Sequence, residues 1–291
     1  MLGVVDAYRS DPADFGPPYK PGSAAWKDHN AERRFVGAWS QMPMRNVHSE
    51  AIRYLNNAED HLRGCGHLIP AEGIVFSPIS LGRTVLNATA AAHWLLAPGV
   101  DAEERIRRHM NVQLNALEEK VQHCGDDPES AQYKAKVERD IDELLDAAGK
   151  AGMTPRKSKG QGRLYINPVM PSDTQMLREF IAHADIPLPA EFLQRIHSAA
   201  VHANPNSLAV ADLVPLEPSR DGVGLAAVRM TLAKMASLML SPTYVFFHGV
   251  LAVHRYFGQP TSGFEASAFS HIRQLSALAV SDGTPISCTS R

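Results

Sequence analysis

The densest group of residues capable of chemistry in this 291-residue sequence lies between Gln194 and Pro205. Ser198 and His202 are one helical turn apart there, and Arg195 precedes His202 by two turns, so one helix stripe would present all three side chains. A histidine can donate or accept a proton near neutral pH, and an arginine can hold a phosphate. We therefore take these three residues as candidate catalytic groups, with His202 as the acid or base. Acyl transfer by a serine–histidine pair is less favoured, because the chain has no Gly-x-Ser-x-Gly turn.

The spacing from Arg195 to His202 is similar to the loose arginine–histidine pattern of HEPN ribonucleases, which are all-α proteins that assemble the motif across a dimer. The resemblance implies metal-independent RNA cleavage at a dimer cleft, with the basic segment 156–163 holding backbone phosphate. The chain has thirteen histidines, so a match to so short a pattern also arises by chance. A dimeric ribonuclease is kept as an alternative function.

Other polar residues interrupt helices that are otherwise apolar. His93 falls within Ala88–Leu96, and Tyr244 and His248 are one turn apart within Tyr244–Val253. Buried polar groups must find partners, so a structural hydrogen-bond network is one interpretation. The other is a ligand pocket between facing helices. We expect the three residues to contact a substrate, within walls formed by Trp94, Phe246 and Phe247.

Two arginines are candidates for binding an anionic group. Arg83 lies on a helix whose other residues are mostly small or apolar, and Arg105 lies on the next helix. A buried arginine needs a carboxylate or similar partner, so structural ion pairing is one interpretation of each. Alternatively, the planar guanidinium receives an anionic group of the substrate. We expect Arg83 to be an anion anchor and Arg105 to bind substrate.

The sequence favours neither a metal nor a cofactor. It contains neither Glu-x-x-His nor His-Glu-x-x-His. Glu119 and His123 are one turn apart, but they lie on a charged helix face where a solvated pair is the simpler interpretation. Aspartate-rich prenyl-diphosphate motifs and phosphate-binding glycine motifs are also missing. We expect no metal site and no cofactor.

Three stretches resemble a family of uncharacterised actinobacterial all-helical proteins. Residues 83–96 and 104–108 resemble the first helical pair of that family, and 196–203 is similar to its Leu-Ser-x-x-x-His-Gly segment. Here Ala203 replaces the glycine, and His197 replaces an aliphatic residue. The resemblance extends over roughly residues 75 to 215 and implies an all-α fold but no activity. It points to Arg83, Arg105, Ser198 and His202 as places to look.

The elements that position these residues are predicted to be helices throughout the chain. Pro78 suits the first turn of a helix, and Asp101 with Glu104 matches a capping box for the next one. Apolar residues then recur every three or four positions in most segments, and no alternating pattern longer than four residues occurs. Later helices are predicted near 173–184, 189–203, 222–240, 242–257 and 264–279, with a long loop over 152–171.

The predicted fold is therefore all-α, a single bundle-like domain of about nine or ten helices. We expect the domain to span residues 29–280, preceded by an irregular N-terminal arm (1–28) and followed by a disordered tail (281–291).

Composition limits the remaining possibilities. The net charge is −2 and the pI about 6.7, so the whole chain exerts no electrostatic pull toward nucleic acid or an anionic membrane. Three cysteines without a CxxC pair favour a reducing compartment, and the first residues do not match a signal peptide. The most apolar stretches are shorter than a membrane span. We expect a cytoplasmic protein with no membrane partner.

The leading interpretation is a small-molecule-binding helical protein, and an enzyme with a histidine acid or base in an interhelical pocket. No motif specifies its reaction. A small-molecule ligand is the expected partner, nucleic acid is a weaker option, and a homodimer remains open. A non-catalytic helical scaffold is the remaining alternative.

Overall fold

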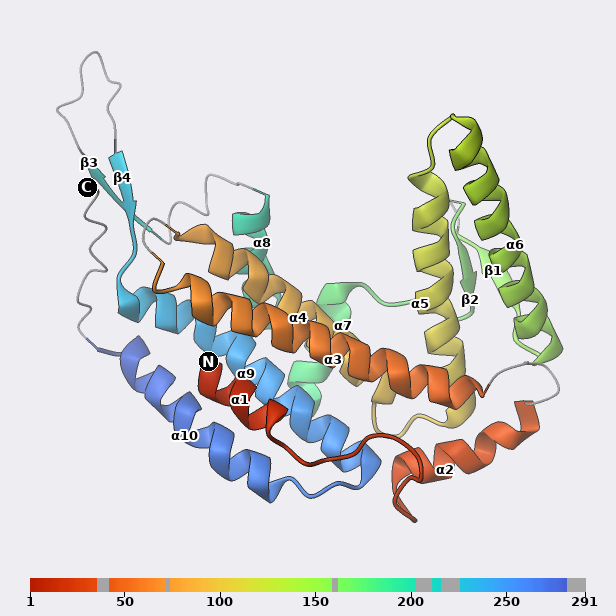
Figure 1. Ribbon diagram of the computed structural model, residues 1–291, viewed down its shortest axis with the longest axis horizontal. Coiled ribbons are helices and arrows are strands. Elements are labelled where there is room, and N and C mark those ends of the chain that lie inside the picture. Colours follow the sequence, from red (N-terminus) through yellow and green to blue (C-terminus); the bar gives the residue numbers. More distant parts are fainter. Residues whose placement is uncertain (36–41, 72–73, 159–161, 203–210, 216–225, 282–291) are drawn as a thin grey trace.

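A computed structural model of the chain (Figure 1) describes residues 1–35, 42–71, 74–158, 162–202, 211–215 and 226–281. Over these described residues the structure is mostly helical, with ten α-helices and few strands. The prediction of an all-α fold with nine or ten helices is confirmed.

Three long helices form the middle of the molecule. α3 (Pro43–Leu68) packs along α4 (Phe76–Leu96), and α4 packs in turn on α9 (Leu232–Phe257). α10 (Ser262–Ala279) packs along α9, as Figure 1 shows. The main core lies between these helices and includes the fully buried Leu55, Leu86, Leu95, Phe246 and Val250.

α9 is one continuous helix, so our prediction of separate helices over 222–240 and 242–257 is wrong. Pro242 lies inside it and is buried. A proline in a helix interior removes one hydrogen bond at a cost of about 3 kcal/mol. Burial of the apolar side chains of Met239 and Val245, on either side of Pro242 in the helix, offsets this cost. α9 alone among the described helices is long and apolar enough to cross a membrane, and 61% of its most apolar stretch is buried inside the molecule. Its packing on α4 and α10 accounts for this composition.

The first residues contain two helices where we expected an irregular arm. α1 (Leu2–Arg9) buries Val4 and Val5 and packs on α10, and α2 (Ala24–Ala31) begins at a Ser23 cap. Helices this short are marginal in isolation and depend on tertiary packing, which local sequence patterns do not reveal. Residues 1–28 therefore include parts of the packed body.

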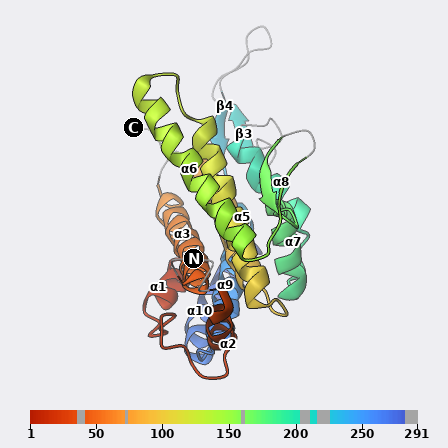
Figure 2. The ribbon, with the colours of Figure 1, turned by 90° about the vertical axis from the view of Figure 1, so that its right-hand side faces the viewer.

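Two antiparallel helices project from this body as an arm. They are α5 (Ala102–Gln122) and α6 (Pro128–Lys150), which lie side by side in Figures 1 and 2. The Asp101 side chain caps α5 by accepting the Glu104 amide at 2.9 Å, as predicted. The Glu104 carboxylate does not complete the predicted capping box, because it binds Arg107 and Arg108.

Two short β-hairpins occupy segments that we predicted as loop or helix. β1 (Pro155–Lys157) pairs antiparallel with β2 (Leu164–Ile166), and β3 (Asp212–Pro215) pairs antiparallel with β4 (Ala226–Arg229). Strands of three or four residues are too short to show an alternating pattern in the sequence. The predicted tail beyond Ser281 lies outside the described residues.

α7 (Asp173–His183) and α8 (Ala190–Val201) both pack on α4. A capping box starts α7: the Ser172 side chain accepts the Gln175 amide, and the Gln175 side chain accepts the Ser172 amide. α4 is thus surrounded by α3, α7, α8 and α9, and it contributes to both cavities described next.

Candidate functional site

The predicted site residues separate into two places on opposite faces of α4. His93, Arg105 and His248 line a first cavity, which we call the histidine cavity. Arg83 lines a second cavity and contacts His202, and we call this second cavity the Arg83–His202 cleft. Helical geometry places His93 on the face of α4 opposite the residues that line the cleft. His202 itself is exposed at the end of α8 and is not among the residues that line either cavity.

The histidine cavity lies between α2, α4, α7, α9 and the turn that joins α4 to α5. Its volume is about 360 Å³, within the range of about 300–1,000 Å³ that is typical of small-molecule sites. Leu96, Phe180 and Val253 give it apolar walls. The space is therefore suited to a small molecule with a mainly apolar body.

Two histidines line this cavity, and each has an unpaired ring nitrogen. The Nε2 atoms of His93 and His248 are buried and have no hydrogen-bond partner among the described residues. His93 is 6% exposed, and its ring packs 4.7 Å from that of Phe180 and 5.2 Å from that of His183, centroid to centroid. A neutral imidazole offers one donor and one acceptor, so each ring can bind a polar ligand group.

Both histidines are held neutral. Burial lowers the pKa of His93 to about 3, and the nearby His183, Arg108 and Arg105 lower it further. Burial also lowers the pKa of His248, with a smaller contribution from Arg255 and an opposing one from Glu265. The positive charge at this cavity therefore comes from its lysine and arginines.

Arg105 lines the cavity and has a structural role, so substrate binding by Arg105 stays a prediction. Its Nε donates to Asp28 at 2.8 Å, and its Nη atoms donate to the backbone oxygens of Leu95, Ala97 and Val100. The last carbonyls of a helix have no hydrogen-bond donor within the helix. At the end of α4 the Arg105 guanidinium donates to them. Four of its five N–H groups are thus already bonded to protein.

A buried chain of hydrogen bonds continues from Asp28. The Tyr256 hydroxyl donates to Asp28 at 2.7 Å and lies 2.8 Å from Nε2 of His48. Nδ1 of His48 lies 2.9 Å from the Tyr19 hydroxyl. Because Tyr256 donates its only proton to Asp28, Nε2 of His48 must be the donor and Nδ1 the acceptor. This network connects the N-terminal segment to α3, α5 and α9.

Two further cations lie at the cavity. Lys27 and Arg255 are exposed, line it, and make no ion pair with a described carboxylate. We had overlooked both, together with Asp28 and His183. Lys27 and Asp28 were assigned to the irregular N-terminal segment predicted over residues 1–28. Arg255 and His183 resemble ordinary cations in the last turn of a helix.

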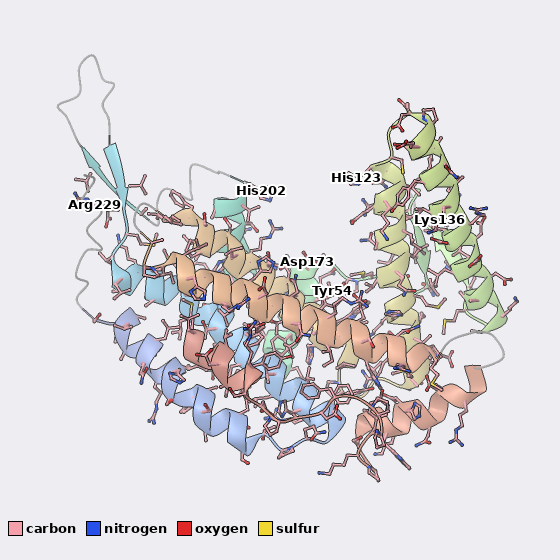
Figure 3. The ribbon with its side chains drawn as sticks, in the orientation of Figure 1. Tyr54, His123, Lys136, Asp173, His202 and Arg229 are labelled. Atoms are coloured by element: carbon pink, nitrogen blue, oxygen red, sulfur yellow. The ribbon has the colours of Figure 1, made fainter. Side chains whose placement is uncertain are left out.

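The Arg83–His202 cleft lies above α3 and α4. Nη1 of Arg83 is 3.2 Å from Nε2 of His202, although the residues are distant in sequence. Arginine only donates, so Nε2 of His202 accepts in this contact. The cleft has a volume of about 520 Å³. Figure 3 shows Tyr54 and Asp173, which line it, below His202.

Three other predicted residues do not join these sites. Arg195 is exposed on α8, and the arginine bonded to His202 is Arg83. Ser198 meets His202 through its backbone oxygen, which accepts the His202 amide at 3.0 Å. The Tyr244 ring packs 4.5 Å from that of His248, but Tyr244 does not line the histidine cavity.

The Glu119–His123 pair lies away from both cavities. Nδ1 of His123 is 2.6 Å from the backbone oxygen of Glu119, whose carboxylate accepts a hydrogen bond from Asn115. Figure 3 shows His123 at the far end of α5. Within the part of the chain that the structure describes, no three His, Cys, Asp or Glu side chains gather so as to hold a metal ion.

Comparisons with protein-family models, with curated proteins and with solved structures find no match to this chain.

Proposed function

We propose that this protein binds a small, largely apolar molecule carrying one anionic group in the histidine cavity. The observation that carries the proposal is the pair of buried Nε2 atoms, from His93 and His248, that lack protein partners. Leaving a buried polar atom unpaired costs about 1–3 kcal/mol, so a ligand that pairs with both atoms gains affinity.

The charges near the cavity indicate the class of ligand. Lys27 and Arg255 have no described counter-ion and attract an anion, while Leu96, Phe180 and Val253 accept an apolar body. The negative charge of Asp28 is already paired with Arg105. A carboxylate on an aromatic or aliphatic body fits this combination.

His248 is the acid–base candidate of the proposed site. A general base works best with a pKa near the operating pH, and the pKa of His93 is too low, at about 3. His248 is less deeply buried than His93 and borders the same cavity. We therefore assign ligand binding to His93 and proton exchange to His248, in place of the His202 role expected from the sequence.

A titration with 4-phenylbutyrate, followed by NMR of the histidine side chains, tests the proposal. We expect the His93 and His248 resonances to shift and 4-phenylbutanol, which lacks the charge, to bind about tenfold more weakly, a difference of about 1.4 kcal/mol. Ala252→Phe fills the cavity and should abolish the shifts, whereas Ala266→Phe on the exposed face of α10 should not. Unmoved resonances, or equal binding by Ala252→Phe, would contradict the proposal.

The two alternatives have weaker support. A ribonuclease would use the Arg83–His202 cleft, but Glu50 and Asp173 also line it and repel a chain of phosphates. A monomer that fails to bind RNA at low salt would exclude this alternative. A scaffold that binds no ligand would not account for the histidine cavity or for the unpaired Nε2 atoms of His93 and His248.

A further inference from the structure

The Arg83–His202 cleft is a separate site, because it shares no lining residue with the histidine cavity. Its floor comes from α3 and α4, and its sides come from the start of α7 and the end of α8. Each of these four helices contributes side chains, so the cleft is formed by the fold and does not belong to a single loop.

Arg83 is a cation without a counter-ion in this cleft. Its only hydrogen bond to a described side chain is the one to Nε2 of His202, and its buried Nε has no partner. Neither carboxylate that lines the cleft forms an ion pair with Arg83: Glu50 pairs with Arg53 at 3.1 Å, and Asp173 accepts from Asn87 at 2.7 Å. An arginine in this state offers its fork of N–H groups to an anion from outside.

Hydroxyl groups extend the donor set around Arg83. Ser80 and Thr84 lie three residues before and one residue after it on α4, and both line the cleft. A guanidinium and two hydroxyls supply more donors than the two oxygens of a carboxylate require. They match the three terminal oxygens of a phosphate monoester.

The rest of the cleft limits what can be attached to that phosphate. Ala88, Ala91 and Met176 form an apolar surface, with Tyr54 beside them. Glu50 and Asp173 line the same space and repel a second phosphate. Burial, with contributions from Glu50 and Asp173, raises the pKa of Tyr54 to about 12, so its phenol stays a donor.

We propose that the Arg83–His202 cleft binds a small organic phosphate monoester, with the phosphate on Arg83, Ser80 and Thr84 and the organic body on the apolar surface beside Tyr54. This site is independent of the function proposed for the histidine cavity.

Calorimetric titration with phenyl phosphate tests the proposal. We expect saturable binding, and binding of inorganic phosphate about tenfold weaker because the ring contacts are lost. Arg83→Gln should weaken phenyl phosphate about tenfold or more. Arg195→Gln removes the same charge from an exposed position on α8 and should leave the affinity within about twofold.

Further variants separate this site from general charge effects and from misfolding. Arg83→Lys keeps the charge but loses the fork, so intermediate weakening is expected even if Arg83→Gln fails to fold. Ala252→Phe, which fills the histidine cavity, should leave phenyl phosphate binding unchanged. Equal losses in the Arg83 and Arg195 variants, no binding of phenyl phosphate, or a loss in Ala252→Phe would each overturn the proposal. Binding of single-stranded RNA that depends on Arg83, in the absence of phenyl phosphate binding, would overturn it in favour of a nucleic-acid site.

Discussion

Arg105 and Asp28 form an ion pair closed off from solvent, with the arginine side chain 2% exposed. We expect Asp28→Ala to lower the free energy of unfolding by about 3–5 kcal/mol, because Arg105 is left buried without a counter-ion. Denaturant unfolding followed by circular dichroism measures this loss. Asp146→Ala breaks an exposed pair with Lys150 and should cost less than about 1 kcal/mol. Equal losses in the two variants would contradict the structural role of Arg105.

Buried histidines make the stability depend on pH. Burial lowers the pKa of His48 and His93 to about 3 and that of His109 to about 4, from 6.5. Above pH 6.5 the rings are neutral in both states, so they do not affect stability there. As the pH falls below this value, the unfolded chain binds protons that the folded chain does not, and stability is lost.

His109→Gln tests this dependence at a residue outside both cavities. Between about pH 7.5 and pH 5.5, the native protein should lose about 1.4 kcal/mol more stability than the variant, since one such group is removed. Urea unfolding at the two pH values gives the difference. Parallel losses in both proteins would show that His109 accepts a proton in the folded state.

The sequence identified individual polar residues that line or border the two cavities more readily than the contacts between them. Arg83, His93, His202 and His248 were singled out because polar residues on apolar helices are conspicuous in a sequence. The contact between Arg83 and His202 joins α4 to α8, and no local pattern encodes such a pairing. For the same reason, the sequence could not show that these residues belong to two cavities.

At the scale of the helices, α4 and α9 approach closely at Gly249. A Cβ atom there would lie 2.2 Å from Cγ2 of Thr89, so Gly249→Ala must push the helices apart. We expect a loss of about 1–3 kcal/mol, despite the higher helix propensity of alanine. Gly149→Ala in α6 meets no atom within 4 Å and should stabilise the protein by about 0.5–1 kcal/mol. Thermal unfolding of both variants measures the contrast, and the same sign for both would refute this account of the packing.

Helices with strong local signals were predicted well, and the errors fall where packing decides. Pro78 and Asp101 mark helix starts by local chemistry, and the structure has α4 and α5 beginning at or within two residues of them. α1 and the continuity of α9 through Pro242 depend on contacts with distant helices. The two hairpins depend on pairing between their strands. β2 is also held on α5, where the carbonyl of the buried Ile166 accepts from the Asn111 side-chain amide and the Ile166 N–H donates to Oδ1 of Asn111.

At the scale of the whole molecule, the apolar side chains do not form one continuous core. Leu114, Val137 and Ile141 make a small cluster between α5 and α6, separate from the main core. The first turns of α5 are tied to the body by Arg105 and Arg107, which bond to backbone oxygens of the α4 end and of β2. Further out, Glu118 and Asn115 of α5 bond to Leu164 and Arg163 of the β1–β2 hairpin segment, and α6 packs chiefly on α5.

The separate cluster in the arm makes α6 a unit that can detach while the rest of the fold persists. Local opening requires less free energy where few buried contacts are lost. In native-state hydrogen exchange, amides of 128–150 should therefore exchange together, faster than those of α9, and with a weaker dependence on denaturant. Exchange of α6 and α9 at a common rate would mean that the arm and the body unfold as one.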